Sequence, residues 1–135
     1  MKIFIKLSII FGVILISSIS LAFTDLCESG NHILSLTTAQ TNKYFKRNLR
    51  NRRVEGQGVV ADVVEVSQEE CYIRVKCEND VYADISTSFE GSVKDLEVGQ
   101  PISFTGDCND YEKEFYQNSS RKYIVITIDN PSLRY

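Results

Sequence analysis

Alternating hydrophobic and polar residues run through the second half of the chain and predict a small β-sheet domain. The clearest alternation spans residues 71–77, where every second residue is apolar. Similar runs follow at 81–86 and 122–129, and a valine-rich run at 57–66 precedes them. A fourth strand is expected within 98–108, after a Gly-Gln turn. The pattern therefore predicts five strands.

Five strands whose one long interruption falls between the third and the fourth favour an oligonucleotide/oligosaccharide-binding (OB) type of β-barrel over residues 54–135. Gly58 lies early in the first strand, where a small barrel needs sharp coiling. A five-stranded immunoglobulin-like sandwich is the alternative. The early glycine and the short length favour the barrel. A polar loop is expected at 107–121, before the last strand.

The chain before the strands lacks this alternation. Residues 23–36 are expected to form an irregular lead-in, because Gly30 and Asn31 interrupt the segment. Residues 37–53 are expected to form a basic helix that starts at a threonine cap, since no Pro or Gly occurs there. The predicted fold is thus an all-β barrel with an N-terminal helix.

Residues 1–22 are interpreted as a secretory signal peptide. Lys2 and Lys6 precede an apolar run over 7–16, and small residues suit cleavage after Ala22. A retained membrane anchor is the alternative, because the apolar stretch is nearly long enough to span a bilayer. Cleavage predicts a periplasmic or secreted protein with one domain.

All four cysteines follow this segment and predict two disulfides, because an exported domain folds in an oxidising compartment. Cys71 and Cys77 are expected in one strand, about 20 Å apart at about 3.3 Å per residue, which is too far for a bond between them. Two pairings stay open, and both tie Cys27 to the barrel. One histidine and no CxxC spacing disfavour a metal site. The disulfide candidates are Cys27, Cys71, Cys77 and Cys108.

Charge is distributed unevenly along the chain. The whole chain has a net charge of −3. Loss of two lysines with the signal peptide would leave a net charge of −5. Residues 23–53 hold six basic and two acidic residues, whereas 54–135 hold seven basic and sixteen acidic ones, a balance of −9. The basic cluster is interpreted as a solvated helix face or as a docking site for an anionic partner. Its members are Lys43, Lys46, Arg47, Arg50, Arg52 and Arg53.

Three segments follow one another as the end of a helix, a strand, and a turn with its strand. They are Tyr44-Phe45-Lys46-Arg47-Asn48, Val54-x-Gly56-x-Gly58-Val59-Val60 and Val98-Gly99-Gln100-x-Ile102-x-Phe104-x-Gly106-x-Cys108. In order and spacing they resemble the exported bacterial OB domains grouped as tRNA-anticodon-binding-like. The resemblance covers roughly residues 38–129. It implies a fold and does not establish tRNA binding.

The sequence contains no recognisable catalytic constellation. His32 is the one histidine and is expected at the surface. Gly56-x-Gly58 is too short for a phosphate loop and lacks the Lys-Ser/Thr that follows one. The carboxylates form no recognisable acid/base or metal motif. We therefore expect a protein that is not an enzyme and needs no cofactor or metal.

OB barrels usually bind ligands on the outer face of strands two and three and on the neighbouring loops. The residues expected there combine rings with cations, which suits stacking on a base or a sugar. Ordinary cross-strand pairing, such as Arg74 with Asp84, is the alternative. The predicted ligand-binding residues are Tyr72, Arg74, Lys76, Tyr82, Asp84, Tyr111, Phe115 and Tyr116.

Three functions follow from these patterns. The leading hypothesis is an exported OB module that binds a protein, a glycan or a small anionic ligand without catalysis. The second is an accessory or protective factor of an envelope or secreted complex that contacts its partner through the basic helix. The third, single-stranded nucleic-acid binding, is disfavoured because an acidic barrel does not neutralise phosphates.

Overall fold

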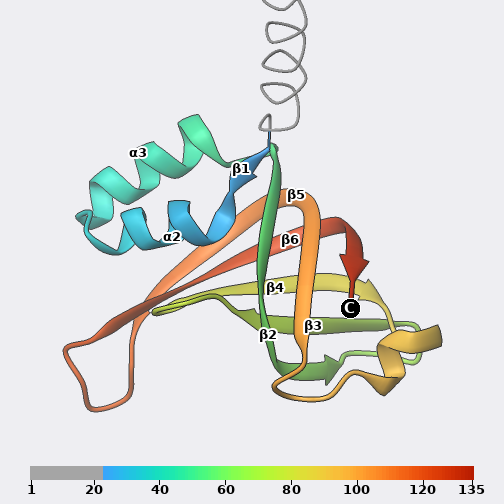
Figure 1. Ribbon diagram of the computed structural model, residues 1–135. Helices are drawn as coiled ribbons and strands as arrows, with labels where there is room; N and C mark the ends of the chain where they lie inside the picture. The colour runs from blue at the N-terminus through green and yellow to red at the C-terminus, as the bar shows by residue number, and fades with distance from the viewer. Residues whose placement is uncertain (1–22) are drawn as a thin grey trace, which may run out of the picture.

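The structure is a computed structural model that describes residues 23–135, so the predicted signal peptide lies outside the described residues. One sheet, two α-helices and a short 3-10 helix make up the described chain (Figure 1). In chain order these are β1 (Thr24–Asp25), α2 (Leu26–Leu34), α3 (Thr38–Asn48), β2 (Arg53–Glu65), β3 (Glu70–Lys76), β4 (Val81–Ser88), η1 (Gly91–Asp95), β5 (Pro101–Phe115) and β6 (Lys122–Arg134).

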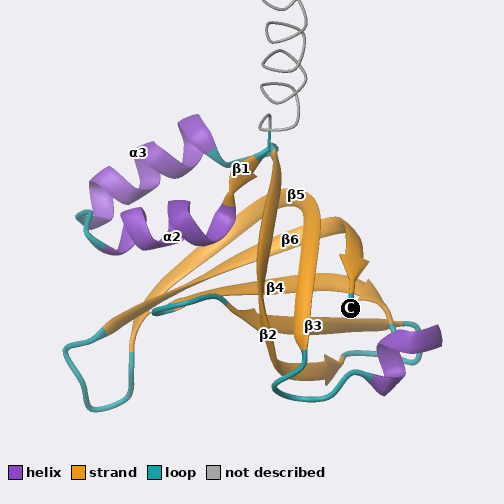
Figure 2. Ribbon diagram, in the orientation of Figure 1, coloured by secondary structure: helices purple, strands orange, loops and turns teal. Residues whose placement is uncertain are grey.

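The strands pair in the order β1-β2-β3-β4-β6-β5, and β2 also pairs with β5. The first half of β2 pairs with β5 and its second half pairs with β3. The pairings from β2 through β5 therefore return to β2 and form a ring. Within this ring β4 and β6 run parallel, and the other pairs are antiparallel. Figure 2 shows α2 and α3 together at one side of the sheet.

The alternation predicted for the middle strands is confirmed. Ile73 and Val75 of β3 are fully buried, as are Ala83 and Ile85 opposite them on β4. Each buried Val or Ile side chain contributes about 1.5–3 kcal/mol. The side chains between them point outward, so the ring has an apolar interior and a polar outer face.

The irregular lead-in predicted for residues 23–36 is wrong, because β1 and α2 occupy most of it. Asp25 caps α2 by accepting a hydrogen bond from the Glu28 amide at 3.2 Å. Gly30, expected to break structure, lies inside the helix, where a Cβ atom would stand 2.4 Å from Val81 Cγ1. The glycine lets α2 approach β4 closely, and this benefit outweighs its poor helix propensity.

The predicted basic helix is confirmed at its start and is shorter than expected. Thr37 and Gln40 form a reciprocal capping box, with hydrogen bonds of 3.2 and 3.0 Å. The helix ends at Asn48, and Asn51 adopts a φ of 61° that turns the chain into β2. Within the described part of the chain, neither helix is long and apolar enough to cross a membrane.

The loop predicted at 107–121 is also wrong, because β5 continues to Phe115 and pairs with β6 in a long hairpin. The register shifts at Cys108/Asp110, where the Asp110 carboxylate accepts a hydrogen bond from the Tyr111 amide at 2.8 Å. On this extension Tyr111, Lys113 and Phe115 alternate with acidic residues. The face of the two rings also carries a lysine and is only partly buried, so the alternation of apolar and polar residues is weaker here than in the other strands.

One of the two predicted disulfides is present. Cys27 of α2 is bonded to Cys77, directly after β3, with their Cα atoms 5.7 Å apart. Cys71 and Cys108 are buried and free, so the second disulfide was wrongly predicted. Cys71 lies between β2 and β4, whereas Cys108 of β5 exchanges backbone hydrogen bonds with the turn after α3. These two cysteines belong to different parts of the ring.

Candidate functional site

The outer face of β3, β4 and β6 arranges its side chains in rows across the sheet. Arg74 of β3 stands opposite Asp84 of β4, and Lys76 stands opposite Tyr82. Tyr82 in turn lies beside Val125 of β6. The register of the strands thus brings residues from distant parts of the sequence onto one wall.

A hollow of about 410 Å³ opens where this wall meets the β5–β6 hairpin. Its volume lies within the range of small-ligand sites. Most of its lining is aromatic, and we call it the aromatic hollow. Its lining residues are Arg74, Tyr82, Phe115, Tyr116, Gln117 and Tyr123.

The rings of the aromatic hollow pack against one another and leave one ring open. The ring centroids of Tyr116 and Tyr123 are 4.8 Å apart at a tilt of 41°, and Tyr82 meets Tyr123 edge-on at 6.0 Å. Phe115 is 59% exposed, and the Lys122 ammonium lies 5.2 Å from its ring centroid. The geometry provides an open aromatic surface beside fixed rings.

Hydrogen bonds fix the hydroxyl groups at the edge of the hollow. Tyr116 donates to Asp80 Oδ1 at 2.9 Å, and its hydroxyl lies 3.2 Å from that of Tyr82. Arg121 Nε donates to Asp80 Oδ2 at 2.8 Å. The Arg121 hydrogen bonds hold the pKa of Asp80 below its ordinary value, and burial raises the pKa of Tyr116. Asp80 is therefore ionised and Tyr116 neutral at neutral pH.

Arg74 is paired across the strands as the alternative interpretation expected. Its Nε and Nη2 donate to the two carboxylate oxygens of Asp84 at 2.7 and 2.8 Å. This hydrogen-bonded pair raises the pKa of Arg74. Asp62 of β2 stands beside Arg74 on the other side. Because acids flank the guanidinium, the hollow presents rings and fixed hydroxyls more than free positive charge.

The structure places the other predicted ligand-binding residues elsewhere. Tyr111 packs its ring against Phe45 of α3, with centroids 4.6 Å apart. Together with Tyr72 and Asp84, Tyr111 lines a separate hollow of about 230 Å³. Lys76 lines a third hollow near the disulfide. Half of the predicted set, namely Arg74, Tyr82, Phe115 and Tyr116, is thus brought together.

Sequence reasoning missed Tyr123 and the pair that holds the hairpin tip, Asp80 and Arg121. Tyr123 could have been found from the alternation of β6, because it precedes the buried residue Ile124 and therefore points outward. The contact between Asp80 and Arg121 depends on how the hairpin folds back onto the β3–β4 turn. No local pattern indicates it.

The six predicted partner-binding residues lie on α3, on the turn after it and at the first position of β2, and none of them lines the aromatic hollow. Arg53 forms an ion pair with Asp107 at 3.2 Å. The Arg50 guanidinium lies 5.5 Å from the ring centroid of Phe45. Lys43, Lys46, Arg47 and Arg52 are exposed.

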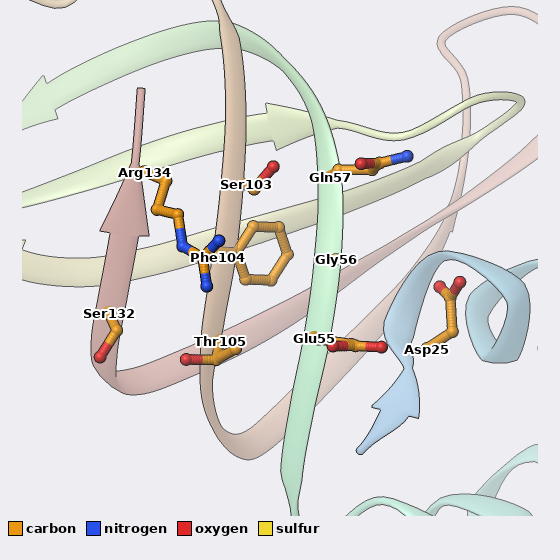
Figure 3. Close-up of a pocket in the computed structure, with 9 residues that line it drawn as sticks. All are labelled: Asp25, Glu55, Gly56, Gln57, Ser103, Phe104, Thr105, Ser132 and Arg134. Carbon is orange, nitrogen blue, oxygen red and sulfur yellow. The ribbon is translucent and has the colours of Figure 1, made fainter. Parts of the chain in front are cut away.

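A polar groove of about 400 Å³ lies over β2, β5 and the end of β6 (Figure 3). Two rows of side chains cross it, because Gln57, Ser103 and Arg134 share one register and Glu55 and Thr105 share the next. In Figure 3 Arg134 reaches in from β6, whereas Glu55 lies at the far side of β2. The polar groove presents hydroxyl, amide and charged groups without an exposed aromatic ring, and so differs in chemistry from the aromatic hollow.

No protein-family model matches the chain, and no curated protein matches its sequence. A lipoprotein of Klebsiella pneumoniae subsp. pneumoniae MGH 78578, provisionally described as nucleic acid-binding, is similar in structure. The TM-score is 0.54 at 14% identity, over 88% of this chain and 96% of that chain. The asparaginyl-tRNA synthetase of Entamoeba histolytica gives a TM-score of 0.44 at 12% identity, over 65% of this chain and 22% of the synthetase. The first likeness shows a common fold, and the tRNA-anticodon-binding-like resemblance stays a prediction.

Proposed function

We propose that the chain is an exported, non-catalytic binding module of the OB type, and that its aromatic hollow holds a glycan. The ring of five strands, closed by the β2–β5 pairing, supports the OB assignment. The longest interruption between ring strands falls between β4 and β5, as expected for this architecture. The fold shared with the Klebsiella lipoprotein agrees with it.

The observation that carries the proposal is the convergence of Arg74, Tyr82, Phe115 and Tyr116 around one hollow. They come from β3, β4 and the end of the β5–β6 hairpin. OB folds bind oligonucleotides and oligosaccharides on the corresponding face and loops. An open ring beside fixed tyrosine hydroxyls suits a sugar, which has both an apolar face and hydroxyl groups.

Charge favours a glycan over a nucleic acid. Residues 54–135 have a net charge of −9. Arg74, which lines the hollow, is paired with Asp84, and Arg121, which lies over the Tyr116 ring, is paired with Asp80. A phosphate backbone would meet few free cations there, and affinity for nucleic acids rests on such cations.

The disulfide supports the export part of the proposal. Disulfides persist in oxidising compartments and are rare in the cytosol. Cys27 and Cys77 form one in this domain. The N-terminal sequence, with two lysines before an apolar run, agrees with secretion.

A glycan array, followed by titration calorimetry of the best oligosaccharide, tests the proposal on the oxidised chain 23–135. Phe115→Ala should weaken binding about two- to tenfold, since this open ring is worth roughly 0.5–1.5 kcal/mol. Because Phe115 is largely exposed, the variant should keep its fold. Arg134→Gln in the polar groove is the control and should leave binding unchanged.

Two results would overturn the proposal. Loss of binding in Arg134→Gln with normal binding in Phe115→Ala would place the site in the polar groove. Salt-sensitive binding of oligo-dT in place of any glycan would make the module a nucleic-acid binder.

A further inference from the structure

The chain contains no Asp or Glu between Glu28 and Glu55, although six Lys and Arg residues occur in that interval. Four of the six follow one another at i, i+3, i+4 and i+7 along α3 and the residues that end it. Residues at this spacing share one face of a helix. They are Lys43, Lys46, Arg47 and Arg50.

Lys43, Lys46 and Arg47 are exposed on the side of α3 that faces away from the core, whereas Arg50, after the end of α3, is half-buried with its guanidinium over the Phe45 ring. The opposite side is buried through Thr41, Phe45 and Leu49, which are also four residues apart. The exposed Arg52 follows at the end of the same segment. We call Lys43, Lys46, Arg47, Arg50 and Arg52 the basic face.

Within residues 23–135, no ion pair joins the basic face to an acidic side chain. The ion pairs among the described residues join Arg53 to Asp107, Arg74 to Asp84 and Arg121 to Asp80. None of them includes a residue of the basic face. Its charge is therefore available to an anionic surface.

The N-terminal segment enters the domain beside the basic face. Thr24 of β1 stands opposite Val54 of β2, so Phe23 lies next to Arg53, close to where α3 ends. Figure 1 shows α3 as the outer element near β1, whereas η1 and the β5–β6 loop lie at the other end of the domain. The start of the described chain and the basic face thus lie at the same end of the domain.

We infer that the basic face rests on an anionic lipid bilayer, to which the apolar N-terminal segment brings the domain. Anionic headgroups attract each nearby Lys or Arg, worth about fivefold in affinity per cation. The attraction fades within a Debye length, about 8–10 Å. A helix is about 10 Å thick, so α3 itself separates the acidic sheet from the headgroups.

The inference holds whether or not the N-terminal segment is cleaved. A retained segment would anchor the domain with the basic face toward the bilayer. Cleavage after Ala22 would create an α-amino group on Phe23, which adds a positive charge beside Arg53. The inference is also independent of the glycan proposal, because Phe115 ends β5 at the tip of the β5–β6 hairpin, whereas the basic face belongs to α3 and the turn after it.

Co-sedimentation with vesicles tests the inference. The chain 23–135 with its disulfide intact holds the whole sheet and both helices. It should bind vesicles that contain phosphatidylglycerol, release them at high salt, and ignore vesicles of phosphatidylcholine alone. The triple variant Lys43→Gln/Lys46→Gln/Arg47→Gln should bind phosphatidylglycerol about a hundredfold more weakly.

A matched variant with the same change in net charge controls for total charge. Lys76→Gln/Lys94→Gln/Arg134→Gln removes three cations outside the basic face and should bind as the unmodified chain does. Thermal unfolding of both triple variants confirms that each is folded. Equal loss in the two variants, or no binding of the unmodified chain to phosphatidylglycerol, would overturn the inference. Capture of an acidic envelope protein by a chain that ignores the vesicles would assign the face to a protein instead.

Discussion

Lys113 donates its ammonium group to the backbone carbonyl of Leu36 at 2.6 Å, across 77 residues of sequence. The same ammonium donates to the Ile33 carbonyl at 2.9 Å and to the Thr41 hydroxyl at 3.3 Å. Carbonyls at the C-terminal end of a helix lack partners within that helix. Lys113 of β5 therefore caps α2 and ties both helices to the hairpin.

Lys113→Met should lower the free energy of unfolding by roughly 1.5–3 kcal/mol, because hydrogen bonds from a charged donor are lost. Urea denaturation followed by circular dichroism measures the change. Lys122→Met, in the neighbouring strand, is the control. It should lower the free energy of unfolding less, since the Lys122 ammonium lies over the exposed Phe115 ring. Equal costs in the two variants would contradict the capping role.

Gly30 and Val81 define how closely α2 approaches β4. Gly30→Ala should lower the free energy of unfolding by about 1–3 kcal/mol, because the added methyl group overlaps Val81. Val81→Ala in the same chain makes room for it. In a double-mutant cycle, the double variant should therefore lose less unfolding free energy than the sum of the losses in the two single variants. Strict additivity would mean that this contact does not set the helix position.

The parts of the fold that could be predicted from sequence are those with one buried and one exposed face. In β3 Ile73 and Val75 alternate with outward residues, so the pattern alone identifies the strand. The β5 extension beyond Asp110 places Lys113 on the same face as Tyr111 and Phe115, so its alternation does not separate apolar from polar residues and the sequence predicts a loop instead. The α2 helix was missed because Gly30, a breaker by propensity, is kept for its contact with Val81.

The part of the candidate site that lies on regular strands could be predicted, because alternation shows which side chains point outward. Arg74 and Tyr82 lie on outward positions of predicted strands, and both line the aromatic hollow. Tyr116 meets Asp80 across 36 residues, and that contact depends on the length and direction of the hairpin. Hairpin geometry follows from long-range pairing, which local periodicity does not encode.

The two free cysteines should be unreactive in the folded protein. Burial raises the pKa of Cys71 and raises that of Cys108 to about 12, so neither thiol ionises at about pH 8. A chromogenic disulfide reagent should find no reactive thiol in the native chain and two after denaturation without reductant. No thiol after denaturation would mean that a second disulfide forms.

The disulfide between Cys27 and Cys77 should make a large contribution to stability. It closes a loop with a sequence separation of 50 residues, and chain entropy for that length gives about 4 kcal/mol. Cys27→Ser/Cys77→Ser should lower the free energy of unfolding by up to that amount. Dithiothreitol should lower the urea midpoint of the unmodified chain and leave that of the double variant unchanged. Sensitivity of both chains to the reductant would contradict this account.

Asp80 should make the stability of the hairpin tip depend on acid pH. Its pKa is lowered in the folded state, chiefly by the Arg121 hydrogen bonds. The folded state therefore binds a proton less readily than the unfolded chain, whose Asp pKa is about 3.9. The stabilisation is complete above that value and is lost as pH falls through the lowered folded-state pKa.

Asp80→Asn isolates this contribution, because the amide oxygen still accepts a hydrogen bond but carries no charge for Arg121. The free energies of unfolding of the two chains, measured from about pH 7 to about pH 2, should differ most at neutral pH. The difference should shrink below about pH 4, where the unmodified carboxylate takes up its proton. The Tyr116 ring signals in NMR spectra should shift over the same interval, since its hydroxyl donates to Asp80. A difference that stays constant with pH would show that the charge of Asp80 does not hold the tip of the hairpin.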